Sequence, residues 1–121
     1  MLVTHGGRKA KRFDWLLQDN YVKIKNENGR QEEYPLGEIL DVLNWLMEKF
    51  GLGWFPLANN VEKLWQNTEV DGLGVAILRQ RPKNISHAQG ASYLGPVLEH
   101  VGILEWNNKQ RGIQWHTIRP V

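Results

Sequence analysis

The residues that could do chemistry in this chain are spread along it rather than grouped at the spacing of a catalytic or metal site. No HxH or HxxxH pair occurs among the four histidines, which are His5, His87, His100 and His116. Cysteine is absent, which excludes disulfides, thiolate metal ligands and thiolate nucleophiles. The sequence therefore predicts no metal and no cofactor.

Acidic residues offer the least favoured alternative, a metal-dependent nuclease. Asp71 with Glu62 or Glu69 could bring carboxylates to a metal ion, but no Glu-x-Lys element follows them. Surface carboxylates explain these side chains better. The segment DGLGVA also lacks the glycine pattern and the Lys-Ser/Thr ending of a phosphate-binding loop. We expect a non-catalytic protein.

Basic residues gather towards both ends of the chain. Residues 1–25 hold six Lys or Arg and two acids, residues 26–78 hold three and nine, and residues 79–121 hold six and two. This distribution favours an anionic partner more than the net charge of +2 does. The alternative is that basic ends are merely solvated. Residues 1–12, which include HGGRKAKR, are expected to be a flexible basic tail.

The N-terminal half of the chain is expected to contain a hairpin and helices that hold the basic residues in place. We expect a short apolar turn or helix over FDWLLQ and a β-hairpin over 21–34, with an Asn-Gly turn. The segment PLGEILDVLNWLMEKFG has apolar residues at three- and four-residue spacing and predicts a helix that stops at Gly51. Residues 57–67 predict a second, shorter helix. Residues 68–82 are read as a helix capped by Thr68 in preference to a buried strand over GVAIL.

The segment from Ile85 to Trp106 carries most of the functional interpretation. Ser86 and Gln89 have the spacing of a capping box, and an apolar stripe follows them. The Gly95-Pro96 pair predicts either a kink or a split into helices 86–94 and 96–101, because proline lacks the backbone donor and crowds the preceding turn.

A second β-hairpin is predicted at the C-terminus. The segments ILEW and IQWHTI flank the polar loop NNKQRG, and each alternates large apolar and polar residues. We expect Leu104 to face Trp115 and Trp106 to face Ile113, so that all four side chains lie on one face.

In this order, the helices and the last hairpin resemble a winged helix-turn-helix domain. SHAQGASYLGPVLEHVGILEW is similar to a recognition helix that runs into the first wing strand, and NNKQRG is similar to a wing loop. The resemblance is architectural and covers about half the chain. It implies binding of double-stranded DNA, with the exposed start of the helix in the major groove.

The resemblance also implies which residues would touch the nucleic acid. Those that would read bases are His87, Gln89, Ser92 and Tyr93. Those that precede the helix and would hold phosphates are Arg79, Arg81, Lys83 and Asn84. Lys109 and Arg111 at the hairpin tip would reach the backbone or the minor groove.

We therefore expect an α+β fold, with a winged-helix-like helical core, a C-terminal β-hairpin and an N-terminal β-hairpin, as one globular domain over residues 13–121. The expected function is nucleic-acid binding, as a regulator of transcription or an accessory factor. The alternative is a protein-interaction or dimerisation module, with a homodimer formed through a tryptophan-rich surface, since the chain has six tryptophans. No apolar run approaches the ~18 residues of a membrane span, and the N-terminus lacks a signal-peptide core, so a cytoplasmic protein without a membrane partner is expected.

Overall fold

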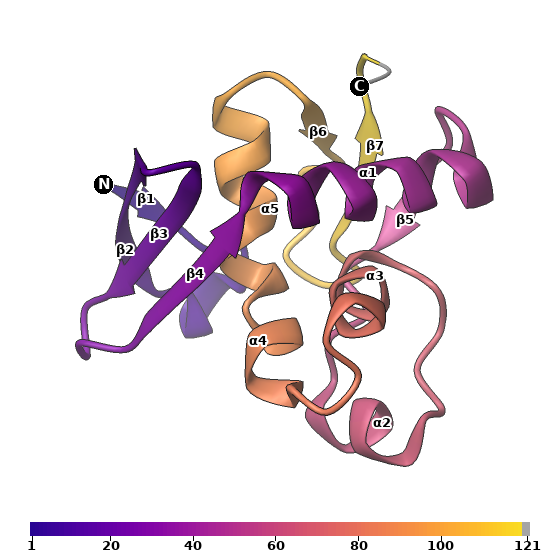
Figure 1. The fold of residues 1–121 in the computed structure, drawn as a ribbon, viewed down its shortest axis with the longest axis horizontal. Coiled ribbons are helices and arrows are strands. Elements are labelled where there is room, and N and C mark those ends of the chain that lie inside the picture. The colour runs from indigo at the N-terminus through magenta and orange to yellow at the C-terminus, as the bar shows by residue number, and fades with distance from the viewer. Residues whose placement is uncertain (120–121) are drawn as a thin grey trace.

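The structure is a computed structural model that describes residues 1–119, and it is an α+β fold with two antiparallel sheets (Figure 1). The N-terminal sheet has the order β1-β2-β3-β4 and consists of β1 (Leu2–Val3), β2 (Arg12–Gln18), β3 (Tyr21–Asn26) and β4 (Gln31–Pro35). The C-terminal sheet has the order β5-β7-β6 and consists of β5 (Phe55–Pro56), β6 (Leu104–Trp106) and β7 (Gln114–Thr117). The helices are η1 (Gly7–Lys9), α1 (Leu36–Phe50), α2 (Val61–Gln66), α3 (Leu73–Gln80), α4 (Ile85–Gln89) and α5 (Ala91–His100).

The first hairpin is confirmed as β3 and β4, joined by a turn in which Gly29 has a φ of +83°. The expectation of a turn or helix over FDWLLQ is wrong, because this segment is strand β2 and pairs with β3. Alternation explains the strand: Phe13 is buried and Trp15 is half-buried, whereas Asp14 and Leu16 are exposed. The exposed Leu16 and Leu17 gave the segment the appearance of a short apolar helix.

The first twelve residues are built into the fold rather than forming a flexible tail. Leu2 and Val3 pair with Phe13 and Arg12 of β2. The segment then turns back on itself, and the Thr4 amide donates to the Lys11 carbonyl (3.0 Å). The His5 ring stacks on Trp106 of the C-terminal sheet, with ring centroids 3.6 Å apart. The N-terminus thus contacts both halves of the molecule.

Helix α1 is confirmed; it begins after Pro35 and ends at Phe50, and its C-terminal cap is Gly51, which has a φ of +57°. Its buried side consists of Ile39, Val42, Leu43 and Leu46. Helix α2 is shorter than expected, because the Asn60 side chain accepts from the Lys63 amide (3.1 Å) and so fixes the start of the helix at Val61.

The segment after α2 contains a helix, as favoured over a strand, but it begins at Leu73 and Thr68 does not cap it. The Gly74 amide donates to the Leu57 carbonyl (2.8 Å), outside the helix. A Cβ at Gly74 would collide with the backbone of Ala58 and Asn59. This close backbone approach sets the start of α3.

The expected capped helix is two helices; the expected cap is wrong, and the chain does not split at Gly95-Pro96. Asn84, not Ser86, is the cap, and its side chain accepts from the His87 amide (3.0 Å). The break lies at Gly90, where a Cβ would collide with the Tyr34 hydroxyl. Helix α5 continues through Gly95 and Pro96, and Gly95 packs against the indole of Trp115. Packing against distant residues therefore decides where this helix breaks.

The C-terminal hairpin is confirmed as β6 and β7, but its register differs from the expected one by two residues. Trp106 pairs with Trp115, and Leu104 pairs with Thr117. The large side chains still share one face, because a shift of two residues preserves the alternation. The connecting loop is closed by the Asn107 side chain, which donates to the Gly112 carbonyl (3.0 Å).

Strand β5, which the sequence analysis did not identify, completes the C-terminal sheet by pairing with β7. In chain order, α1 and β5 are followed by helices α2 to α5 and then by β6 and β7, so a helical core precedes the C-terminal hairpin, as expected. The N-terminal sheet lies on one side of α4 and α5, and α1, α3 and the C-terminal sheet lie on the other (Figure 1).

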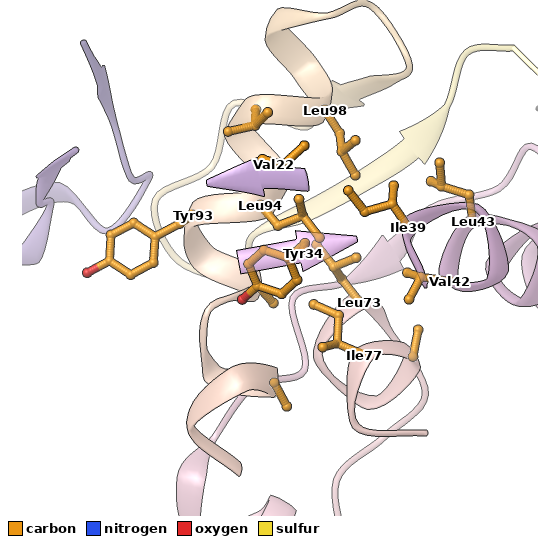
Figure 2. Packing of buried hydrophobic residues seen from close by; sticks show 14 of the residues in the cluster. Val22, Tyr34, Ile39, Val42, Leu43, Leu73, Ile77, Tyr93, Leu94 and Leu98 are labelled. Carbon is orange, nitrogen blue, oxygen red and sulfur yellow. The ribbon is translucent and has the colours of Figure 1, made fainter. Parts of the chain in front are cut away.

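One buried cluster joins these layers. Leu94 of α5 lies among side chains of β3, β4, α1 and α3, including Val22, Tyr34 and Leu73 (Figure 2). Within residues 1–119, no helix has the length and apolarity needed to cross a membrane.

Candidate functional site

The N-terminal sheet covers part of the helix surface that was expected to read DNA. His87 and Tyr93 have only 1% and 6% of their surface exposed. Tyr93 accepts a hydrogen bond from the buried side chain of Asn26 on β3 (3.1 Å). The expectation that His87 and Tyr93 face a groove is therefore corrected, since both side chains are held inside the protein.

His87 lies between two carboxylates. Its Nδ1 is 3.2 Å from Glu32 Oε2 on β4, and its Nε2 is 2.9 Å from Glu38 Oε1 on α1. A neutral imidazole has one N–H donor, so both contacts are hydrogen bonds only when the ring is protonated. The cluster of Glu32, Glu38 and His87 thus joins the N-terminal sheet, α1 and α4.

Tyr34 and two arginines complete this cluster. The Tyr34 ring stacks on His87 with centroids 4.4 Å apart, and its hydroxyl donates to the His87 carbonyl (2.7 Å). Burial raises the pKa of Tyr34 well above its ordinary value, so the hydroxyl remains a donor. Arg30 donates to the Ser86 carbonyl (2.8 Å), and Arg81 lies 3.4 Å from Glu38.

The pKa of Glu32 is lowered from its ordinary value, chiefly by the hydrogen bond from His87 and further by the charges of His87 and Arg30. Burial opposes this shift but does not outweigh it. Glu32 therefore stays ionised at neutral pH.

The basic residues before α4 do not join the face of Gln89 and Ser92. Arg79 lies over the Trp45 ring at 5.0 Å, and Arg81 pairs with Glu38. Lys83 and Asn84 are exposed, and Asn84 also caps α4. Arg79 and Lys83 line a wide groove of about 910 Å³ together with the acids Glu69 and Asp71. This surface therefore has mixed charge.

A separate cleft lies between the N-terminal segment and the exposed side of α4 and α5. A cavity of about 340 Å³ is lined by Lys9 and Lys11 of that segment, by Gln89 and Ser92 of the helices, and by Arg30 of the turn between β3 and β4. It adjoins a second hollow of about 730 Å³, which shares Gly6 and Lys9 with it and adds Arg8, Gln110 and Arg111. We call the two together the basic cleft.

The residues that line the basic cleft include no aspartate or glutamate. Arg8, Lys9, Lys11 and Arg111 form no ion pair with any residue in 1–119, whereas Arg30 lies 3.6 Å from Glu32. Unpaired cations on a concave surface produce a positive local potential, despite the small net charge.

The sequence analysis identified part of this cleft. Of the residues that it assigned to nucleic acid, the cleft brings together Gln89, Ser92, Tyr93 and Arg111, and Lys109 lies in the same loop as Arg111. It missed the contribution of residues 4–11 to a folded site, although their basic composition was the signal. Arg30 and Asn59 gave no signal, because only the tertiary fold brings them to the cavity.

The carboxylates considered for a metal-dependent nuclease are not gathered into a site. The Glu69 side chain accepts from the backbone amides of Asn60 (3.0 Å) and Val70 (2.9 Å). Over residues 1–119, no group of three or more His, Asp or Glu side chains is arranged to hold a metal ion.

Comparison with models of protein families, with curated proteins and with solved structures gives no match to this chain.

Proposed function

We propose that this protein binds DNA along the phosphate backbone through the basic cleft, in a regulatory or accessory role. The observation that carries the proposal is a concave surface lined by Arg8, Lys9, Lys11, Arg30 and Arg111 without a carboxylate. Phosphate contacts of this kind provide most of the affinity of proteins for DNA and do not require a particular sequence.

The arrangement differs from a recognition helix inserted into the major groove. His87 and Tyr93 are buried, and the Ser86 carbonyl and hydroxyl accept hydrogen bonds from Arg30. Gln89 and Ser92 are half-buried at the base of the cleft. We infer that the basic side chains at the rim of the cleft hold the phosphates, and that Gln89 and Ser92 contact the DNA deeper in the cleft.

The test is a titration of a fluorescent blunt DNA duplex with the wild-type protein and the Lys9→Ala/Lys11→Ala variant at low salt. We expect the double variant to bind about tenfold more weakly, because two phosphate contacts are lost. Fluorescence anisotropy gives the two dissociation constants. Absence of binding by the wild type at low salt would refute the proposal.

The matched control is Lys49→Ala/Arg79→Ala, which removes the same charge beside Trp45, away from the cleft. We expect this control to bind the duplex within about twofold of the wild type, since only long-range electrostatics changes. If it weakens binding as much as the cleft variant does, the interface does not lie at the cleft.

A second candidate function is self-association through the free edge of β2. Beyond its pairing with β1, no described strand pairs with that side of residues 14–18, and Leu16 and Leu17 are 51% and 59% exposed. An antiparallel pairing of two copies would place Leu16 opposite Leu17 and Trp15 opposite Gln18.

Sedimentation velocity tests this candidate over a range of protein concentrations. We expect a dimer in the wild type and a monomer in the Leu16→Lys/Leu17→Lys variant, because charges on an edge strand oppose pairing. A wild-type protein that stays monomeric at every concentration would exclude this candidate.

A further inference from the structure

The cavity of the basic cleft has features that phosphate binding alone does not explain. Its lining includes the aromatic residues Tyr93 and Trp115 and the uncharged polar residues Asn59, Gln89 and Ser92. At about 340 Å³ it lies within the range of sites that enclose a small organic group. An inorganic phosphate would leave most of this volume empty.

Trp115 supplies an unused hydrogen-bond donor. Its side chain is 1% exposed, and its indole Nε1 has no partner among residues 1–119. A buried donor without an acceptor is unfavourable, and such groups in folded proteins usually serve a purpose. The N–H lies beneath the surface of the cavity, so an acceptor reaches it only when the lining shifts as a group enters.

Other polar side chains of the lining are also free to bind. The Asn59 side chain donates to the Gln89 carbonyl (2.8 Å), which leaves its oxygen available. The side chains of Gln89 and Ser92 form no hydrogen bond with the described part of the chain, so they offer both donors and acceptors. Together with the indole N–H, these groups match the polar edge of a nucleobase.

Cations lie at the same cavity. Lys9, Lys11 and Arg30 line it with the aromatic and amide groups, and no carboxylate does. Stacking surfaces, amide groups and cations together are the means by which proteins hold unpaired nucleotides.

We propose that this cavity takes one unpaired nucleotide of the DNA bound along the cleft, an inference that rests on the function proposed above. The phosphates on either side lie against Lys9, Lys11 and Arg30. The base enters the cavity that Tyr93 and Trp115 line, and its edge meets Gln89, Ser92 and the Trp115 Nε1 donor. The preferred partner is then DNA with an unpaired position rather than a perfect duplex.

The experiment compares three probes by fluorescence anisotropy: a blunt duplex, the same duplex with one unpaired thymidine bulge, and a single-stranded oligothymidine. Thymidine monophosphate is added as a competitor. We expect the bulged duplex and the single strand to bind about tenfold or more tightly than the blunt duplex, and the monophosphate to compete only weakly.

Ser92→Phe is designed to fill the cavity from α5 without changing the charge of the rim. We expect it to remove the preference for the unpaired probes, measured as the ratio of their affinities to the affinity for the blunt duplex. Asn44→Phe, at an exposed position on α1, is the matched control and should keep the preference.

Trp115→Phe, checked for folding by circular dichroism, removes the N–H and should reduce the preference with the cavity left open.

The two proposals fail in different ways. If no probe binds, DNA binding itself is refuted. If all probes bind equally and Ser92→Phe changes nothing, DNA binding stands and the nucleotide cavity is refuted. If the monophosphate binds tightly and displaces the single strand at equal concentration, the site serves a free nucleotide, which overturns its assignment to a strand.

Discussion

His87 shows how one residue can have a structural role where its sequence position suggested DNA contact. Both of its ring nitrogens face carboxylates, Glu32 at 3.2 Å and Glu38 at 2.9 Å, and its side chain is 1% exposed. Removing a buried side chain that two partly buried carboxylates contact leaves those carboxylates without their partner. The residue is therefore expected to hold the N-terminal sheet against the helices.

Replacing His87 by alanine is predicted to lower the free energy of unfolding by about 3 kcal/mol, because two partly buried carboxylates lose the imidazole that both contact. Chemical denaturation at neutral pH measures the change. His116→Ala is the control, since His116 contacts Glu105, whose side chain is 61% exposed, and such surface contacts contribute about 0–1 kcal/mol. Equal losses in the two variants would contradict a special role for His87.

Glu32 gives this cluster a dependence on pH. Because its folded-state pKa is lowered below the ordinary 4.5, its contribution to stability is present above pH 4.5 and is lost as the pH falls through the folded pKa. Glu32→Gln is predicted to be about 1–2 kcal/mol less stable than the wild type at neutral pH. The difference should shrink on acidification below 4.5, as thermal unfolding at several pH values will show. A difference that stays constant down to the lowest pH would contradict this linkage.

At the scale of elements, Gly90 decides how the segment between Asn84 and Val101 is divided. Its Cα lies against the Tyr34 hydroxyl, which donates to the His87 carbonyl at 2.7 Å. A methyl group there would displace Tyr34 and break this bond. Alanine at Gly90 therefore cannot simply join α4 and α5 into one longer helix.

Gly90→Ala is predicted to destabilise the protein by about 2 kcal/mol, through steric overlap and a lost buried hydrogen bond. Gly37→Ala in the first turn of α1 is the matched control, since a Cβ there meets nothing within 4 Å. This control should be neutral or up to about 1 kcal/mol more stable, because alanine favours helix. Thermal unfolding of both variants checks the pair, and a stabilised Gly90→Ala would show that the break is not imposed by Tyr34.

Elements with a strong local pattern could be predicted from the sequence, and elements defined by distant contacts could not. Helix α1 and the hairpin of β3 and β4 follow from apolar spacing, Gly51 and the Asn-Gly turn. Strand β5 has two residues and exists only because β7 lies beside it. The cap at Asn84 depends on competition between neighbouring polar side chains, and the break at Gly90 depends on the distant Tyr34. The spacing of apolar residues reports neither of these.

At the scale of the whole molecule, the main departure is the position of the N-terminal sheet. The sequence predicted a hairpin and a winged-helix-like core separately, but nothing in either pattern says that β3 and β4 pack on α4 and α5. That packing buries Tyr93. The exposed basic side chains lie instead in the cleft beside residues 4–11. The basic N-terminus was expected to be a flexible tail, and only the fold makes it one wall of a site.

The charge distribution of the whole molecule leads to a prediction about salt. With a net charge of only +2, overall attraction to DNA is weak, and counterion release must come from the cations of the cleft. The logarithm of the binding constant should fall linearly with the logarithm of salt concentration, by about 0.9 for each phosphate contacted. Replacing Arg111, which shares a hollow with Arg8 and Lys9, should therefore reduce the slope by about one unit.

Anisotropy titrations of a blunt duplex at several salt concentrations measure this slope for the wild type, Arg111→Ala and Lys49→Ala. Lys49 lies beside Trp45 on α1, so its loss changes the net charge equally but removes no cleft contact. The control should keep the wild-type slope. A slope near zero in the wild type, or an equal reduction in both variants, would mean that the attraction does not arise at the cleft, because only groups that contact phosphates release counterions.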